Sequence, residues 1–257
     1  MFITRRRFMS ITRRSLIGAL TALTLLAGNT AQAVDGAAKR IMVYGDSNTW
    51  GYIPVESGPT TRYPEDVRWT GILRATLGPG YEVIEEGLSA RTTDLPDPTL
   101  PQITGAGLDG SAYLPAALAT HLPLDLVVIL LGTNDLKKMF DRSPFRIALG
   151  VGKLVDIVAQ TKGGVGTAYA VPKVLVLCPP PLGALAPPER AERFAGGLEK
   201  SKVLPAHYEA IAKAAGAEFL DVGKLTATDG LDGVHFTAAG HQAIGTGVAE
   251  KVKAILK

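Results

Sequence analysis

A serine and a histidine near opposite ends of the chain have the surroundings of a nucleophile and its base. Ser47 lies in Gly45-Asp46-Ser47, directly after the apolar run Ile41-Met42-Val43, which is typical of a strand that ends in a tight turn. His235 follows Asp232 in the sequence Asp-Gly-Val-His. A hydroxyl, an imidazole and a carboxylate form the set that acyl transfer by a Ser-His-Asp triad requires, whatever their order along the chain. Only folding can bring the two segments together.

A serine nucleophile also needs hydrogen-bond donors for the negative charge that develops on the carbonyl oxygen of the substrate. The backbone N–H of Ser47 is one candidate. Asn134, in Gly-Thr-Asn-Asp, follows a second apolar run and offers a side-chain amide. The segment 87–93 follows a third run and offers a backbone N–H. Strand ends of one parallel sheet meet at the same edge, so we expect these donors to converge.

Five apolar runs of strand length alternate with stretches of helical length. Two of them, 126–131 and 174–177, are rich in Leu and Val without polar alternation, which is typical of strands buried on both faces. The pattern predicts a three-layer α/β/α, flavodoxin-like sandwich with a central, mainly parallel five-stranded sheet. The expected strands are 40–44, 81–86, 124–131, 173–178 and 217–221, and the expected helices lie near 66–77, 111–121, 143–161, 198–215 and 237–256.

Three stretches rich in Pro, Gly or Thr interrupt this alternation, at 51–65, 91–110 and 179–188. Each follows the carboxyl end of an expected strand, which is where open α/β sheets place their ligand crevices. Long loops in a compact domain are more often functional than idle. We therefore expect the three stretches to border the substrate site.

The first 33 residues differ from the rest of the chain. They have a basic start, an apolar run from Leu16 to Ala27 and a small-x-small end at Ala31-Gln32-Ala33. This layout predicts a secretory signal peptide cleaved after Ala33, which leaves one hydrolase domain at 34–257. The alternative, an uncleaved membrane anchor, is disfavoured because the apolar run is shorter than the roughly 20 residues of a spanning helix.

The same segment contains two arginine pairs, in Thr12-Arg13-Arg14-Ser15-Leu16-Ile17 and in Thr4-Arg5-Arg6-Arg7-Phe8. The first resembles the twin-arginine export signal, which directs folded proteins across a membrane. The second competes with it as the pair that the export system recognises. We expect an exported protein, periplasmic or extracellular, without membrane association once the signal is removed.

The net charge of +3 over 257 residues comes from that segment. Its five arginines, with no acidic residue, leave 22 Lys and Arg against 24 Asp and Glu in the remainder, a net charge of −2. A domain of that charge gives no support to nucleic-acid binding. The 46% content of hydrophobic residues supplies a sizeable core.

Few other residues have the spacing of a site. Cys178 is the sole cysteine, and the chain has no His-x-x-x-His, so we expect neither a metal nor another cofactor. Asp46 and Asp135 have the positions of turn-bracing residues. The remaining histidines, His121, His207 and His241, are assigned surface or packing roles by default.

Four ordered blocks, namely Gly-Asp-Ser, the segment 87–93, Gly-Thr-Asn-Asp and Asp-x-x-His, resemble the GDSL-type, or SGNH, hydrolase family. The likeness is closest to its arylesterase and acyltransferase (perhydrolase) branch, through Gly-Asp-Ser-x-Thr-Trp-Gly, Val67-Arg68-Trp69-Thr70-Gly71 and Glu85 to Thr93. It also implies higher oligomers of this chain.

The resemblance implies a role for each site residue. Ser47 would be the nucleophile, His235 the general base and Asp232 its orienting carboxylate, with Asp229 the nearest alternative carboxylate. The oxyanion hole would comprise the N–H groups of Ser47 and Ala90 and the side chain of Asn134. The residues expected to line the substrate pocket are Trp50, Tyr52, Phe194 and Val234.

The chain departs from the family pattern at three places. Ala90 stands where glycine is usual, so we expect less space beside the acyl group. Asn48 stands where leucine is usual. The segment 188–194 is more charged than the apolar segment of this branch.

We therefore expect an exported serine esterase for short, acetyl-like esters that transfers the acyl group to water and, when water is poorly placed, to alcohols or peroxide. A deacetylase of sugars or cell-wall glycans is the alternative with the same triad. A non-catalytic binding module is disfavoured because all four blocks are intact.

Overall fold

The computed structural model describes residues 37–56, 58–100, 103, 105–228 and 230–257. The predicted signal peptide, residues 1–33, and the alternative carboxylate Asp229 lie outside the described residues. Within the described ranges, no helix combines the length and the apolar character that crossing a membrane would require.

The core of the fold is a five-stranded sheet in the order β2-β1-β3-β4-β5, and all four strand pairings are parallel. This confirms the predicted α/β fold with its parallel sheet. The ends of β4 are the expected ones, and those of the other strands differ from the expected ends by at most two residues. The strands are β1 (Lys39–Gly45), β2 (Tyr81–Gly87), β3 (Leu126–Leu130), β4 (Lys173–Cys178) and β5 (Glu218–Asp221).

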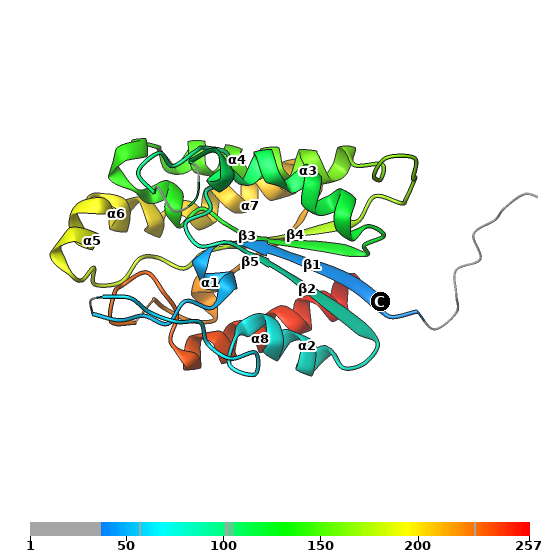
Figure 1. Cartoon of the computed structure of the whole chain (residues 1–257), viewed down its shortest axis with the longest axis horizontal. Coiled ribbons are helices and arrows are strands. Elements are labelled where there is room, and N and C mark those ends of the chain that lie inside the picture. Colours follow the sequence, from blue (N-terminus) through cyan, green and yellow to red (C-terminus); the bar gives the residue numbers. More distant parts are fainter. Residues whose placement is uncertain (1–36, 57, 101–102, 104, 229) are drawn as a thin grey trace, which may run out of the picture. The chain divides into compact units, whose positions relative to one another are not determined.

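Both faces of the central strands are apolar because helices cover both faces. Along β1, Met42 and Tyr44 join one hydrophobic cluster, whereas Ile41 and Val43 join the other. Figure 1 shows α3, α4 and α7 above the sheet and α2 and α8 below it. Their bounds are α2 (Trp69–Leu77), α3 (Gly110–His121), α4 (Pro144–Gln160), α7 (Leu204–Ala214) and α8 (Ala238–Ile255).

A buried histidine joins the two helices of the lower layer. The backbone N–H of Trp69, at the start of α2, donates to Nδ1 of His241 on α8 at 3.2 Å. Burial lowers the pKa of His241 to about 4, helped by the nearby Arg68 guanidinium. A neutral imidazole is the form that can accept this bond. His241 therefore has a packing role.

The expected helix at 198–215 is two helices, α6 (Gly197–Lys202) and α7. Pro205 explains the break, since its nitrogen has no hydrogen to donate one turn back and its ring crowds the preceding turn. A further helix, α5 (Pro188–Arg193), begins where the expected irregular stretch 179–188 ends. Pro188 has the fixed φ that suits a first helical turn.

The order of the strands fixes where a ligand can bind. β1 lies between β2 and β3, so the chain leaves β1 toward one edge of the sheet and returns on its other side. A crevice forms outside the carboxyl ends of the strands at such a reversal. Short elements occupy this end of the molecule: α1 (Ser47–Trp50) and the 3₁₀ turns η1 (Gly105–Leu108), η2 (Asn134–Leu136), η3 (Lys138–Phe140) and η4 (Val222–Lys224).

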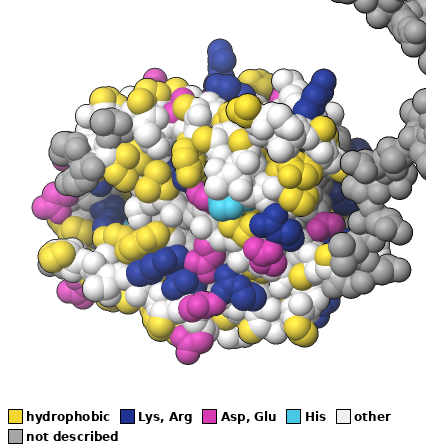
Figure 2. Space-filling view, turned by 45° about the vertical axis from the view of Figure 1, so that its right-hand side comes forward, with side chains coloured by type: hydrophobic (Ala, Val, Ile, Leu, Met, Phe, Trp, Pro, Cys, Tyr) yellow, Lys and Arg dark blue, Asp and Glu magenta, His cyan; other side chains and the backbone are white. Residues whose placement is uncertain are grey.

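The surface carries charges of both signs. On the face in Figure 2, Lys and Arg side chains lie among Asp and Glu side chains rather than in one basic patch. Exposed ion pairs such as Arg40–Glu82 and Lys251–Glu218 contribute to this mixture. Such pairs each add about 1 kcal/mol of stability or less.

Candidate active site

Ser47 is the first residue of α1, and only Asp46 separates it from the end of β1. Asp46 caps this short helix, because its Oδ1 accepts the backbone N–H of Asn48 at 2.9 Å. The turn needs glycine at position 45, since a Cβ there would lie 2.0 Å from Oγ1 of Thr49. The helix ends at Gly51, which has a φ of 93°. The strand, the cap and the two glycines hold the Ser47 hydroxyl at the carboxyl end of the sheet.

The loop between β5 and α8 brings a histidine and an aspartate to this serine. Nε2 of His235 lies 2.9 Å from Oγ of Ser47, and Nδ1 of the same ring lies 2.6 Å from Oδ2 of Asp232. All three residues are buried. With Nδ1 donating to the carboxylate, Nε2 is free to accept the serine proton. General-base activation of a serine requires this arrangement.

The Asp232 carboxylate is held in its charged form. Burial alone would raise its pKa, but the hydrogen bond and charge of His235, with the backbone N–H groups of Val234 and His235, lower that pKa to about 2. Burial lowers the pKa of His235, against the opposing pull of Asp232. A neutral imidazole beside a charged carboxylate is the resting state that a general base needs.

Asn134 begins η2 and points its amide toward the serine turn. Its Nδ2 donates to the backbone oxygen of Arg91 at 3.2 Å and to Oδ2 of Asp46 at 3.4 Å. Burial raises the pKa of Asp46 to about 7. Asn134, Ala90 and Ser47 line the same pocket, so the three residues predicted to supply donors lie together.

Ala90 has the backbone conformation that favours glycine, with a φ of 70°. A non-glycine residue in this region costs roughly 1–3 kcal/mol, and such residues cluster at functional sites. The buried Arg91 holds the turn, because its Nη1 donates to the backbone oxygen of Gly45 at 2.9 Å and also to that of Glu86. The guanidinium lies 4.1 Å from the centre of the Tyr44 ring. At this turn Ala90 lines the pocket.

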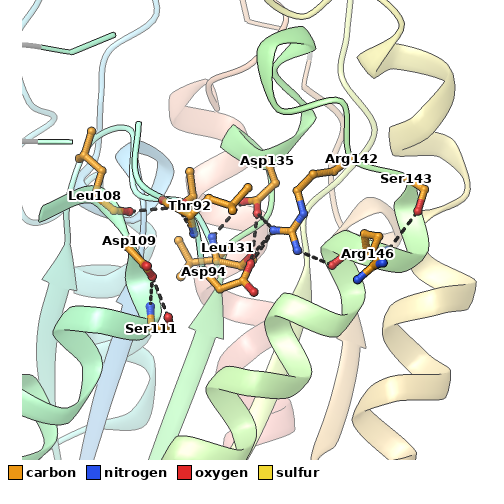
Figure 3. A network of polar contacts seen from close by, with 12 residues as sticks. Thr92, Asp94, Leu108, Asp109, Ser111, Leu131, Asp135, Arg142, Ser143 and Arg146 are labelled. Carbon is orange, nitrogen blue, oxygen red and sulfur yellow. Dashed lines mark hydrogen bonds and ion pairs between the residues drawn. The ribbon is translucent and has the colours of Figure 1, made fainter. Parts of the chain in front are cut away.

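A buried carboxylate connects the loops that follow β2 and β3 (Figure 3). Oδ2 of Asp135 accepts the backbone N–H of Thr93 at 3.0 Å, and Oδ1 accepts its hydroxyl at 2.6 Å. The Arg142 guanidinium pairs with Asp135 at 2.7 Å and with Asp94 at 2.6 Å. Burial raises the pKa of Asp135, while Thr93 and Arg142 oppose that shift. This network fixes the Ala90 turn relative to Asn134, as a bracing role for Asp135 predicts.

Ser47 lines a cavity of about 200 Å³. The ring of Tyr52 stacks on that of His235, with centroids 4.0 Å apart. A second, larger hollow of about 520 Å³ adjoins the first through the shared Arg193. The first is lined by Ser47, Tyr52, Ser89, Ala90, Leu100, Asn134, Lys137, Arg190, Arg193, Phe194, Val234 and His235. The second is lined by Thr99, Lys138, Met139, Glu189, Glu192 and Arg193.

Three of the four residues expected in the substrate pocket line it, namely Tyr52, Phe194 and Val234. Trp50 is not among the lining residues. It closes α1 at the side of the molecule where the Arg62 guanidinium lies 5.5 Å from its ring centre. After α1 the chain turns at Gly51, and Tyr52 lines the pocket instead.

Sequence patterns did not single out Leu100, Lys137, Arg190 or Arg193 as pocket residues. Lys137 is buried and its Nζ lies 2.6 Å from Oδ2 of Asp97. The two arginines lie on α5, in the charged segment noted in the sequence. The charges were the available signal, but nothing in the sequence indicated which side of the molecule they occupy.

The other two spare histidines lie outside the pocket lining. Nε2 of His121 lies 2.8 Å from a carboxylate oxygen of Glu86. The ring of His207 meets that of Phe145 edge to face, with centroids 6.0 Å apart. Both contacts fit the surface or packing role assigned by default.

The chain is similar to a known family and to several solved structures. The model of the GDSL-like Lipase/Acylhydrolase family matches residues 43–243. Est24, a carbohydrate acetylesterase from Sinorhizobium meliloti, is 52% identical, with 84% of this chain and 99% of that chain covered and a TM-score of 0.80. The M. smegmatis aryl esterase is 51% identical, with 85% and 100% covered and a TM-score of 0.81. A second carbohydrate acetylesterase family member from S. meliloti is 37% identical, with 85% and 99% covered and a TM-score of 0.78. No curated protein matches the chain.

Proposed function

The chain belongs to the GDSL-like lipase/acylhydrolase family and is a carboxylic ester hydrolase, and from that premise we propose that it hydrolyses esters of short, acetyl-like acyl groups through an acyl-enzyme on Ser47. The observation that carries the mechanism is the pair of distances at His235. One nitrogen lies 2.9 Å from the serine oxygen and the other 2.6 Å from Asp232. Both are within the range that proton transfer and orientation require.

The reaction has two halves. His235 takes the proton of Ser47 as Oγ attacks the ester carbonyl, and it returns that proton to the alcohol oxygen when the C–O bond breaks. Water then attacks the acyl-enzyme while His235 takes its proton, and Ser47 regains a proton as the acid leaves. Asp232 stays charged throughout and stabilises the imidazolium that forms in each half.

The oxyanion of both tetrahedral intermediates would be held by Ser47 N–H, Ala90 N–H and Asn134 Nδ2. This assignment is supported by the common pocket that the three residues line and by the network that fixes their loops. Donors held in advance of the reaction need no reorganisation when the charge develops.

A short acyl group is supported by the size of the cavity at Ser47, about 200 Å³, and by its walls of Tyr52, Phe194 and Val234. The methyl group of Ala90 takes further space beside the oxyanion position. Apolar walls also leave water few hydrogen-bonding partners next to the acyl-enzyme. We propose on this ground that alcohols or peroxide compete with water as acyl acceptors. The yield of the new ester formed from an added alcohol measures this competition.

A second candidate is a carbohydrate acetylesterase. It is supported by the likeness to Est24 and by the adjoining hollow, whose polar side chains suit the hydroxyl groups of a sugar leaving group. Rates on p-nitrophenyl acetate and on acetylated xylan separate the two. A preference for the glycan by kcat/KM would favour this second function.

The nucleophile is tested by Ser47→Ala. Loss of the hydroxyl removes the covalent intermediate, and such knockouts in other serine hydrolases cost roughly 10⁶ in kcat. The variant should fold normally, since the hydroxyl is not needed for packing. Mass spectrometry of the parent after rapid quenching with p-nitrophenyl acetate should locate an acetyl group on Ser47. Activity within tenfold of the parent would refute the assignment.

Export is a separate proposal, supported by the arginine pairs that precede the apolar run in residues 1–33. Recovered mature protein should begin at Val34. Replacing Arg13 and Arg14 with lysine, or Arg5 and Arg6 in a parallel variant, should show which pair is required. A protein that leaves the cytoplasm unchanged in both variants would contradict the twin-arginine route.

A further inference from the structure

The carboxylate that is proposed to orient His235 also has a positively charged partner. Nη1 of Arg190, on α5, forms an ion pair with Oδ2 of Asp232, the same oxygen that lies 2.6 Å from Nδ1 of His235. The other oxygen, Oδ1, accepts the backbone N–H groups of Val234 and His235 at 2.9 Å each. Asp232 is fully buried, and these four groups are its polar partners among the described residues.

Arg190 also belongs to the wall of the substrate pocket. Together with Arg193 and Phe194 it brings α5 and the residue after it against the cavity at Ser47. The helix has six residues, none of them buried and no side-chain cap. A helix this short does not hold its own shape in water. Its position over the site must therefore come from a few anchors, of which the Arg190 ion pair and the buried Phe194 are two.

We propose that Arg190 is a positioning residue of the triad: its ion pair holds the Asp232 carboxylate toward His235 and fastens the α5 wall over Ser47. This inference rests on the proposed function of Ser47, His235 and Asp232. It also gives a role to the charged segment in which the chain departs from its family.

The ion pair also affects the protonation of His235. A guanidinium on Asp232 offsets part of the negative charge that would otherwise favour the imidazolium, and it lowers the pKa of His235 in the same direction as burial does. The imidazole thus stays neutral, and active, into more acidic solution. Among the described residues, the charged or titratable side chains around His235 are Asp232 on its own segment, Tyr52 after α1, Lys137 between η2 and η3, Arg190 and Arg193 on α5, and His241 on α8.

The test is the pH dependence of kcat/KM for p-nitrophenyl acetate, which reports the free enzyme. At low pH the profile falls as His235 becomes protonated, and this fall is the acid limb. In Arg190→Met the acid limb should move to higher pH by about one unit, because the charge of Asp232, no longer offset by the guanidinium, favours the imidazolium. We expect kcat to fall by about tenfold as the carboxylate and the α5 wall lose an anchor. Arg190→Lys keeps the charge and should restore most of the acid limb.

Arg193→Met is the matched control, since it removes a cation from the same helix and the same cavity. No ion pair joins Arg193 to a carboxylate among the described residues, so this variant should change KM but leave the acid limb in place. An equal shift in both variants would mean that general pocket charge, and not the ion pair, sets the limb. An unmoved limb in Arg190→Met would also overturn the proposal.

A second measurement is independent of catalysis. The chain has four histidines, so the NMR titration of His235 can be identified by comparison with His235→Gln. The His235 titration should move upward in Arg190→Met and stay in place in Arg193→Met. If Ser47 proved not to be the nucleophile, this titration would still test the ion pair. If Ser47 is acylated and the titration does not move, the role of Arg190 alone is wrong.

Discussion

Replacing Asn134 with alanine separates the stabilisation of the transition state from the binding of substrate. Nδ2 of Asn134 is held between the backbone oxygen of Arg91, at 3.2 Å, and Oδ2 of Asp46, at 3.4 Å. The two contacts keep the amide beside the serine turn, and donation to an oxyanion at Ser47 would exchange one of these acceptors for the substrate oxygen. Deleting one such donor costs roughly 10²–10³ in kcat, equivalent to about 2.7–4 kcal/mol of barrier. KM should change little, because the ground-state carbonyl carries less charge.

The same change has a separate effect on folding. The buried carbonyl of Arg91 loses its donor, and an unsatisfied buried acceptor costs about 1–3 kcal/mol of unfolding free energy. For a domain of this size that lowers Tm by roughly 2–4 °C for each kcal/mol. The variant should therefore be folded at 25 °C, and a loss of rate at that temperature cannot be a loss of native protein.

The assay is initial-rate hydrolysis of p-nitrophenyl acetate well above pH 6.5, corrected by the rate with Ser47→Ala. Asn48→Ala is the matched control: Asn48 is another buried asparagine beside the nucleophile, but its Nδ2 donates to the backbone oxygen of Val234 at 3.2 Å. It should lose stability to a similar degree and lose less kcat than Asn134→Ala. A change in Asn134→Ala confined to KM would refute the reasoning, because it would mean that Asn134 holds the substrate and not the oxyanion.

Three further predictions follow from the same contacts. Asp232→Asn should keep the fold but lower kcat by roughly 10⁴, because the amide stabilises the wrong tautomer of His235; an unchanged rate would assign the orienting role to another carboxylate. Acetyl and propionyl esters should be hydrolysed far faster than octanoyl esters, with about 1–3 kcal/mol lost for each methylene that does not fit; Ala90→Gly should narrow that preference, and a peak at eight carbons would show an open groove instead. The pKa of His241 is about 4 in the folded protein against 6.5 for the ordinary imidazole, so the unfolded chain binds more protons between these pH values. The contribution of His241 to the free energy of unfolding should therefore be complete above pH 6.5 and fall by about 3 kcal/mol as the pH drops to 4. Urea unfolding of the parent and of His241→Phe at both pH values would measure this difference.

The layers of the fold follow from local patterns in the sequence. The run 174–177 has no polar residue, and strands buried on both faces must look so when helices cover both sides. The division of the expected helix 198–215 could also have been predicted, since Pro205 removes a donor from its interior. In contrast, α5 has no apolar stripe and depends on its anchors, so its residues do not mark it as a helix.

The site was predictable to the extent that its residues carry fixed chemistry. Ser47, His235, Asp232 and Asn134 are recognisable by type and by the blocks in which they occur. The residues of the pocket wall were not predictable in this way. Tyr52 lines the cavity and Trp50 does not, and this depends on the turn at Gly51. Arg190 meets Asp232 across the fold, and no spacing along the chain indicates that contact.

The position of His235 just before the last helix has a consequence for when the protein acquires activity during its synthesis. A chain emerging from the ribosome contains Ser47, Ala90 and Asn134 before His235 and α8 exist, because synthesis proceeds from the amino terminus. α8 then closes the lower layer through the bond between Trp69 and His241. Under the proposed mechanism, a growing chain that still lacks His235 cannot cleave esters, so activity begins only after the segment between β5 and α8 has been made.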